Sequence, residues 1–395
     1  MRIALIAHLS DFPGPYSSSR RVEMLAQGLV ERGHPVSVVI PRKLTDGSME
    51  IHYKGIEVCW QYAGKGVNLQ KARLMSRWRT WLWVMGMLRQ NCLDWIWLYN
   101  LGLEGLPIAL SARFSRCKIA TVCGDVRYHP AHPIFEDRVR LAWIELADSL
   151  LPKLSQLNIV DTHFLERRAQ RFAPRVPTLV IPSLVDPNVF HHEDNVAQVY
   201  RMQWGLEGFT VIGYFGSFFV INGVSNLFHA VRKLLDDGKK VKLLIAGKTS
   251  DGLDCDDIPT LIKKLSLEDF VIFPGLLDSE EVIKAMSVCD ILTIPRIAHL
   301  SNEAGFPTKL AEYLSMGKAI VTASVGDIPS YITDGVNGML VEAGSIDALV
   351  KALEVLIDDT DIRSKLAANA RKTACEVFDY RRAAAIIETS LQSIR

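Results

Sequence analysis

The sequence predicts an α/β protein built from two doubly wound, Rossmann-like domains that face a central cleft. Short apolar runs of strand length alternate with segments whose apolar residues recur at helical spacing. A polar, turn-rich stretch at 183–205 interrupts this alternation near the middle of the chain. The length of 395 residues suits about two domains, each able to bury its own core.

The first half of the chain opens with a β–α–β unit. Residues 3–7 form an apolar run, apolar side chains at helical spacing follow between 22 and 30, and Gly33 is placed to end that helix. A second apolar run at 36–40 completes the unit, which implies a parallel sheet with right-handed crossovers. Further strands of this half are expected at 95–99, 119–122, 158–160 and 178–181. We assign residues 1–185 to the first domain.

A second β–α series follows the turn-rich stretch. Its strands are expected at 211–213, 242–246, 271–273, 290–294 and 319–323, with helices between them, for example at 225–236 and 279–287. We assign residues 186–372 to the second domain, and 373–395 to a C-terminal helix that packs back on the first. Ligands of such folds bind at the carboxyl ends of strands and between domains, so we expect the functional site there.

Composition and charge exclude several classes of protein. The net charge of +1 gives no electrostatic case for a nucleic-acid partner. The seven cysteines contain no C-x-x-C pair and the ten histidines show no zinc spacing, which favours reduced thiols in the cytoplasm and no structural metal. The apolar N-terminal run is too short for a signal peptide, and no stretch is long enough to span a membrane.

The segment from Pro295 to Gly317 carries the densest set of candidate functional residues. It contains Arg296, Glu303, Pro307, Thr308, Lys309 and Glu312. An apolar strand, a polar loop and a helix that starts at Pro307 form the usual anion site of α/β proteins, because the first amides of the helix remain available. Charges of both signs suit a ligand with phosphates at one end and hydroxyls at the other, such as a nucleotide sugar. Lys309 and Glu312 also fit an ordinary surface ion pair at i, i+3.

The loop after the first strand, HLSDFPGPYSSSR at 8–20, has two interpretations. It lacks the G-x-G-x-x-G pattern of dinucleotide-dependent dehydrogenases. Gly14 allows a close approach of the backbone, and the serines at 17–19 can cap the following helix. The loop is therefore either a capped surface loop or a segment that closes over a diphosphate or an acceptor. Two other strings, Gly247-Lys248-Thr249 and Asp254-Cys255-Asp256, resemble a P-loop and a metal-binding D-x-D motif only superficially.

Residues 71–89, KARLMSRWRTWLWVMGMLR, form an unusual basic and aromatic segment. It holds five cations and three tryptophans without one acidic residue. This composition is typical of a helix that lies in a membrane interface with its cations toward anionic lipid. The alternative is an outer helix of the sheet with a basic exposed face. We favour the membrane interpretation, whereas Trp95 and Trp97 are expected in the core.

Several strings along the chain, taken together and in order, are typical of one known family. These are SSSRRVEMLAQGLVERGHPVSVV at 17–39, VIPSLVDPNVF at 180–190, VKLLIAGK at 241–248, LEDFVIFPGLLDSEEV at 267–282, CDILTIPR at 289–296 and GFPTKLAEYLSMGKAIVTASVGDIPSYITDGVNGMLVEAGSIDAL at 305–349. Through these strings the chain resembles, nearly from end to end, the bacterial retaining glycosyltransferases of family 4, which have the GT-B fold.

The resemblance also implies roles for individual residues in donor binding. Glu312 matches the family's second conserved glutamate, which contacts the ribose, whereas the first would fall at Ala304 and the nearest acid is Glu303. Ser217 and Asn222 stand where the family has an arginine and a lysine that bind the diphosphate. Lys309, Arg296, the Gly216 backbone and the helix start at Pro307 and Thr308 are expected to replace them.

On the acceptor side, the family's His-Asp pair at the end of a first-domain strand corresponds to Gly124 and Asp125, so the histidine is absent. Asp125 is the expected catalytic residue there. His129 and His132 are near enough in sequence to assist, and we take His129 with Glu303 as further catalytic candidates.

The implied activity is a retaining, metal-independent hexosyl transfer from a UDP- or GDP-linked sugar to an acceptor hydroxyl, without a cofactor. The acceptor is expected to be a glycan or a lipid-linked glycan of cell-surface polysaccharide or glycolipid assembly, at the cytoplasmic face of the membrane. The lost family cations motivate an alternative, a non-catalytic nucleotide-sugar-binding subunit of another transferase. Another GT-B reaction, such as sugar epimerisation, is a third option.

Overall fold

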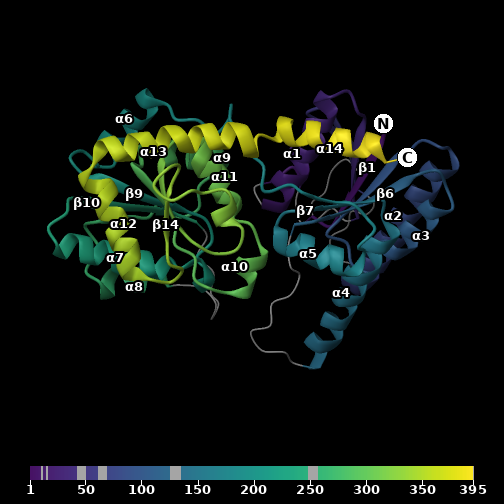
Figure 1. Ribbon diagram of the computed structural model, residues 1–395, viewed down its shortest axis with the longest axis horizontal. Coiled ribbons are helices and arrows are strands. Elements are labelled where there is room, and N and C mark those ends of the chain that lie inside the picture. Colours follow the sequence, from purple (N-terminus) through teal and green to yellow (C-terminus); the bar gives the residue numbers. More distant parts are fainter. Residues whose placement is uncertain are drawn as a thin grey trace. The chain divides into compact units, whose positions relative to one another are not determined.

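The structure is a computed structural model that describes residues 1–9, 12–14, 17–41, 50–60, 69–124, 135–247 and 257–394. The chain divides into two compact units (Figure 1). The first comprises Met1–Ser183 together with Tyr380–Arg395, and the second comprises Leu184–Asp379. The units thus adjoin at 183 and 184 rather than at 185 and 186, and the returning segment starts at Tyr380 rather than at residue 373.

The first unit is built on an eight-stranded sheet of order β3-β4-β2-β1-β5-β6-β7-β8. Every neighbouring pair is parallel except β3 and β4, which form an antiparallel edge. The strands are β1 (Ile3–Ala7), β2 (Val36–Ile40), β3 (Glu50–Tyr53), β4 (Ile56–Trp60), β5 (Trp95–Tyr99), β6 (Lys118–Cys123), β7 (Leu157–Val160) and β8 (Thr178–Val180). The chain runs outward from β1 in both directions, so the switch point of the sheet lies between β1 and β5.

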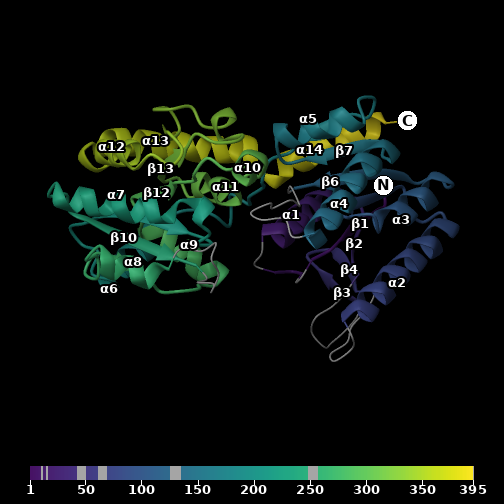
Figure 2. The ribbon, with the colours of Figure 1, turned by 90° about the horizontal axis from the view of Figure 1, so that it is seen from below.

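The helices of the first unit connect these strands, and one of them comes from the end of the chain. They are α1 (Ser17–Glu31), α2 (Leu69–Arg89), α3 (Gly105–Arg113), α4 (Phe135–Leu154), α5 (His163–Phe172) and α14 (Tyr380–Ser393). α14 lies against α1 (Figures 1 and 2). The Tyr380 hydroxyl accepts a hydrogen bond from Gln27 Nε2 (3.0 Å) and donates one to Glu31 Oε1 (2.6 Å).

The second unit contains a six-stranded sheet of order β11-β10-β9-β12-β13-β14, parallel throughout. Its strands are β9 (Thr210–Phe215), β10 (Val241–Ala246), β11 (Val271–Ile272), β12 (Ile291–Ile294), β13 (Ala319–Ala323) and β14 (Met339–Val341). Its helices are α6 (Asp194–Gln203), α7 (Val224–Asp236), α8 (Ile258–Lys264), α9 (Ser279–Val288), α10 (Leu300–Ala304), α11 (Thr308–Ser315), α12 (Ile346–Asp358) and α13 (Thr360–Thr373). Three single turns, η1 (Val220–Asn222), η2 (Ile328–Ser330) and η3 (Ala374–Phe378), complete it. Its switch point lies between β9 and β12.

Both faces of the second sheet are covered, which explains why its strands read as continuous apolar runs. Val211 and Phe215 of β9 belong to a core cluster with residues of α9, α11 and α13, whereas Ile212 and Tyr214 belong to a cluster with α7, α8 and α12. Successive side chains of a strand point to opposite faces, so one strand contributes to both clusters. The prediction of two doubly wound α/β sheets is confirmed.

Local signals in the sequence account for several helix starts. Asp278 and Glu281 form a capping box at α9, and Ser345 and Asp359 cap α12 and α13 with their side-chain oxygens. Thr162 caps α5 in the same way. Ser17–Ser19 form the first turn of α1 itself.

Several elements depart from the sequence-based expectation, among them α6, β3, β4 and β14. The stretch expected as a linker at 183–205 contains α6, which packs on α9. The β3–β4 hairpin was not expected, because β3 alternates exposed and half-buried residues and offers no apolar run. Trp95 and Trp97 are buried, as expected.

The basic and aromatic segment forms the helix α2. Ser76, Thr80, Val84 and Leu88 are buried at helical spacing, so one stripe of α2 packs on the unit. Over the described residues, none of the helices is both long and apolar enough to cross a bilayer.

Candidate functional site

The candidate site lies in the second unit, at the carboxyl ends of β9 and β12. These strands flank the switch point of the sheet, which is where ligands of such folds usually bind. Gly216 and Ser217 follow β9, and Arg296 follows β12. Asn302, which is buried, ties the two loops together: its Nδ2 donates to the carbonyl oxygens of Ile221 (2.7 Å) and Ile297 (2.8 Å).

Lys309 is the central cation of this site. Its Nζ donates a hydrogen bond to the Tyr214 hydroxyl (2.8 Å) and lies 4.1 Å from the centre of the Tyr214 ring. The Tyr214 hydroxyl donates in turn to the carbonyl oxygen of Ser217 at 2.7 Å. Gly216 has a φ of +145°, and a Cβ there would lie 2.7 Å from Lys309 Nζ. Any side chain at position 216 would therefore displace the lysine.

The surroundings of Lys309 weaken its hold on a proton. Burial is the main reason that the pKa of Lys309 falls from 10.5 to about 7, because the ammonium loses water. The positive charge of Arg296 lowers the pKa further, and the negative charge of Glu312 raises it without restoring the usual value. Two cations that repel each other in a partly buried site are stabilised by an anion.

Arg296 is held in place by the turn that precedes α11. Its Nη1 donates a hydrogen bond to the carbonyl oxygen of Gly305 at 2.9 Å. Sequence reasoning grouped Arg296 with Lys309, and the structure brings them close enough for Arg296 to lower the pKa of Lys309.

The start of α11 differs by one residue from the expectation. Pro307 is the N-cap residue and the helix begins at Thr308, because Pro307 has an extended ψ of 107°. The amide of Leu310 bonds back to the Pro307 carbonyl oxygen (2.9 Å), so the amides nearest the N-terminus are those of Thr308 and Lys309. Tyr313 anchors this helix to the end of β9: its hydroxyl accepts from the Phe215 amide (2.7 Å) and donates to the Phe215 carbonyl (3.2 Å).

The polar residues after β9 are tied to one another. Asn222 Nδ2 donates to the Ser217 carbonyl oxygen (3.0 Å) and to Ser217 Oγ (3.1 Å). Gly223 then takes a left-handed φ of +69°, and a Cβ on it would lie only 1.9 Å from the Pro295 carbonyl oxygen. Ser217 and Asn222 thus shape the loop beside the cations.

The two glutamates of the segment stand in different surroundings. Glu303 is exposed on α10, and its Oε2 accepts from the Gly326 amide at 3.2 Å. Ala304, where the family's first glutamate would fall, is fully buried. Glu312 is half-buried in α11, one turn after Lys309, and its charge acts on that lysine.

Several other predicted residues are not part of the site as the structure describes it. Asp125, His129 and His132 fall outside the described residues, as do Lys248, Thr249 and the two aspartates of the D-x-D string. Gly14 is described and belongs to the first unit. Sequence reasoning missed Tyr214 and Asn302: Tyr214 is hidden in an apolar strand, whereas Asn302 stands in the same segment as Arg296.

The electrostatics of this site suit an anionic ligand. Two cations and a helix N-terminus converge at a switch point, and this set can bind phosphate groups. The Gly216 amide, which was expected to assist, instead donates a hydrogen bond to the Ala246 carbonyl oxygen at 2.9 Å. Among the described residues, no three histidine, cysteine or acidic side chains are grouped to hold a metal ion.

Part of the second unit matches a known family. Residues 198–373 match the family described as glycosyl transferases group 1. Alpha-D-kanosaminyltransferase of Streptomyces kanamyceticus is 26% identical over 208 residues, covering 52% of this chain and 51% of that enzyme. The chain spans about half the length of the curated relatives it matches.

Solved structures show the same fold over the whole chain. Sucrose-phosphate synthase of Thermosynechococcus elongatus superposes with a TM-score of 0.79 at 17% identity, covering 99% of this chain and 98% of that one. Anabaena Alr3699/HepE in complex with UDP-glucose gives a TM-score of 0.75 at 20% identity and covers both chains fully, at 100%. Residues 198–373 thus match the group 1 glycosyl transferases, and the chain has the fold of the GT-B glycosyltransferases.

Proposed function

We propose that the protein is a retaining, metal-independent glycosyltransferase that moves a hexosyl group from a UDP- or GDP-linked donor to an acceptor hydroxyl. The observation that carries the proposal is the pair of Lys309 and Arg296 beside the N-terminus of α11, within the segment that matches the group 1 family. The relative named alpha-D-kanosaminyltransferase supports a glycosyl transfer, and the neighbour in complex with UDP-glucose supports a nucleotide-sugar donor.

In the proposed reaction, the bond from the anomeric carbon to the diphosphate breaks and a bond to the acceptor oxygen forms. Negative charge builds up on the departing diphosphate. Lys309, Arg296 and the amides of Thr308 and Lys309 would stabilise it, and such fixed donors are the usual major source of catalysis. Glu312 would hold the ribose hydroxyls. If the departing phosphate accepts the proton of the acceptor, no strong protein base is required.

Donor binding is tested with a thermal-shift screen of UDP, GDP and their hexose conjugates. A nucleotide at 100 times its Kd should raise the free energy of unfolding by about 2.7 kcal/mol. Lys309→Met should weaken binding by roughly 10- to 100-fold, since a charged hydrogen bond is lost. Lys351→Met, an exposed lysine of α12, is the control and should bind normally. Unchanged binding by Lys309→Met would refute the site.

Transfer is tested by incubation with donors and hydroxyl acceptors, followed by NMR of the anomeric configuration in the product. A retained configuration, in the presence of a chelator, is expected. Binding without transfer or hydrolysis would favour the non-catalytic subunit instead. Asp125 is proposed to orient the sugar or the acceptor, and normal transfer by Asp125→Asn would remove it from the mechanism.

We further propose that α2 places the enzyme on the cytoplasmic face of an anionic membrane, where polysaccharide or glycolipid assembly takes place. Met75, Trp78 and Leu82 are exposed along α2, and Arg77, Arg79 and Arg89 are exposed beside them. Flotation with liposomes that contain anionic lipid tests this. Changing the three arginines to glutamate should abolish flotation, and retained flotation would refute the proposal.

A further inference from the structure

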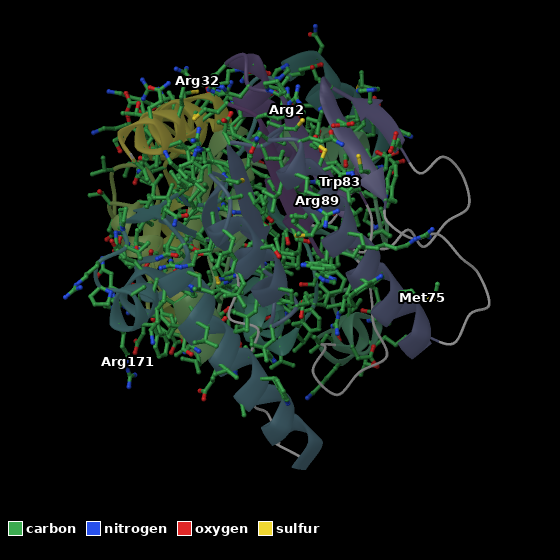
Figure 3. The ribbon with its side chains drawn as sticks, turned by 90° about the vertical axis from the view of Figure 1, so that its right-hand side faces the viewer. Arg2, Arg32, Met75, Trp83, Arg89 and Arg171 are labelled. Carbon is green, nitrogen blue, oxygen red and sulfur yellow. The ribbon has the colours of Figure 1, made fainter. Side chains whose placement is uncertain are left out.

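A cavity of about 1160 Å³ lies in the first unit, whereas the candidate donor site belongs to the second. It is bounded by α2, α3, α4 and the segment that follows β5. Its walls include Trp78, Trp81, Asn100, Glu104, Ser111 and Trp143. Figure 3 shows α2, the helix that carries Trp78 and Trp81, between the labelled residues Met75 and Arg89. The volume exceeds what most small-molecule sites need, about 300–1,000 Å³.

One side of the cavity is a preformed aromatic wall. The Trp78 and Trp81 rings lie 5.0 Å apart, and Trp81 Nε1 donates a hydrogen bond to Ser111 Oγ at 3.1 Å. Trp78 is nevertheless 60% exposed, and Trp143 of α4 is 57% exposed. Large aromatic surfaces left in water on two helices of one cavity mark a place that a ligand covers.

The other side of the cavity carries a fixed negative charge. Burial opposes ionisation of Glu104, but hydrogen bonds from its own amide and from Gly102, with His8 and Arg77 nearby, lower its pKa. Glu104 Oε1 accepts from the Gly102 amide (3.0 Å) and lies 3.4 Å from His8 Nε2. Asn100 is fixed by accepting from the Gly124 amide at 3.1 Å. His8 follows β1 and Asn100 follows β5, so this polar end sits at the switch point of the sheet.

The polar end and the apolar wall of the cavity together favour a ligand with one polar and one apolar part. An alkyl chain alone would strip water from the Glu104 carboxylate without replacing its hydrogen bonds, which is costly. A carboxylate and an amide instead suit a group that donates several hydroxyls. A sugar alone would leave much of the apolar wall uncovered, and the exposed Met75 and Leu82 continue that wall along α2.

We infer that this cavity binds an amphiphile with a hydroxyl-bearing head group at Asn100 and Glu104 and an apolar chain along Trp78 and Trp143. That this amphiphile is the acceptor rests on the proposed transferase function. The acceptor class would then be a glycolipid rather than a free sugar.

The test uses three soluble probes with the full-length protein. These are n-octyl glucoside below its micelle concentration, methyl glucoside, which has the head group alone, and octyl sulfate, which has the same chain and an anionic head. Calorimetry and tryptophan fluorescence measure binding. Octyl glucoside should bind saturably, and each of the other two at least about tenfold more weakly.

Two variants and a control make the result specific to the cavity. Trp143→Ala should weaken octyl glucoside by about tenfold. Glu104→Gln keeps an acceptor for the Gly102 amide and should reduce the preference for octyl glucoside over octyl sulfate by a similar factor. Phe114→Ala, an 89% exposed aromatic outside the cavity walls, should change neither value.

Three results would overturn the inference. These are no saturable binding of octyl glucoside, probe binding by both variants that equals that of the wild type, and a change of oligomeric state in Trp143→Ala showing that a second copy covers the surface. Binding of UDP and GDP, measured on the same samples, tests the proposed donor site independently of the cavity. Nucleotide binding without amphiphile binding would refute only the cavity, and the reverse result would refute only the donor site.

Discussion

Lys309 and Tyr214 lie 95 positions apart in the sequence, yet their side chains form the most distinctive contact of the candidate site. The lysine rests on the ring and hydroxyl of the tyrosine, in surroundings that lower its pKa to about 7. At neutral pH, Lys309 is therefore protonated in only part of the folded molecules. An arriving diphosphate would raise the pKa again and would draw a proton from solution.

The first prediction concerns the pH dependence of stability. The folded pKa of Lys309 is about 7 and the unfolded value is near 10.5. Between these values the unfolded chain binds the extra proton, so the lysine costs more stability as the pH falls from 10.5 towards 7. Relative to Lys309→Met, the free energy of unfolding of the wild type should fall by about 1 kcal/mol for each unit by which the pH is lowered in this window. Urea unfolding at pH 7, 8 and 9 measures this, and parallel curves for both proteins would contradict it.

The second prediction concerns Gly223, whose left-handed conformation brings it against the Pro295 carbonyl oxygen. Gly223→Ala should destabilise the protein by more than about 2 kcal/mol, since backbone strain adds to a direct overlap. It should also weaken nucleotide binding, because the overlap moves the loop that carries Arg296. Gly238→Ala, with a φ of +77° and no atom within 4 Å of the added Cβ, should cost only the strain, about 1 kcal/mol, and should leave binding intact. Equal unfolding free energies for the two variants would show that the overlap is relieved.

How far the site could be foreseen depends on the residue. Lys309 and Arg296 were predicted because charged residues in a loop between apolar strands stand out. Tyr214 was not predicted, because it belongs to an apolar strand and its hydroxyl contacts Lys309, which is distant in the sequence. The displacement of the helix start from Pro307 to Thr308 reflects a ψ angle that sequence does not specify.

At the scale of elements, continuous apolar strands were predicted most reliably, because both faces of these sheets are buried. β3 and α6 were missed for a shared physical reason. β3 is a half-exposed edge strand, and α6 lies in a polar stretch, so neither is specified by a local apolar pattern. Their positions depend on packing against β4 and α9, which are tertiary contacts.

The third prediction concerns α14, which completes the first unit. Ile387 is fully buried there, whereas its neighbour Ile386 is 52% exposed. Ile387→Ala should lower the free energy of unfolding of the first unit by about 2–4 kcal/mol, and Ile386→Ala by less than about 0.5 kcal/mol. Tryptophan fluorescence in urea follows this unit, because seven of the eight tryptophans belong to it, all except Trp204. Similar midpoints for the two variants would show that α14 contributes little.

At the scale of the molecule, each unit has a core of its own. The two clusters that cover the second sheet use residues of Leu184–Asp379 only, and a cluster that includes Ile96 and Leu151 lies wholly within the first unit. The division into two domains was predictable because chain length and a break in the strand pattern both indicate it. The return of α14 could be expected only through the family resemblance.

The fourth prediction follows from these separate cores. A fragment of residues 184–379 should fold alone with a cooperative transition and should bind the same nucleotide as the full chain, since the candidate donor site lies within it. A fragment of 1–183 should fold poorly, because it leaves the apolar face of α1 without α14. Circular dichroism and nucleotide titration test both fragments. A molten 184–379 fragment would mean that its cores need the rest of the chain.

The polypeptide passes from one unit to the other twice, once at Ser183–Leu184 and once at Asp379–Tyr380. A protease that cuts only the first of these passages would leave α14 still joined to the second unit. The packing and hydrogen bonds of α14 on α1 would keep the two pieces together, so the nicked protein should elute as one species from a sizing column. The cleavage would be visible on a denaturing gel, whereas limited proteolysis followed by native chromatography would underestimate it.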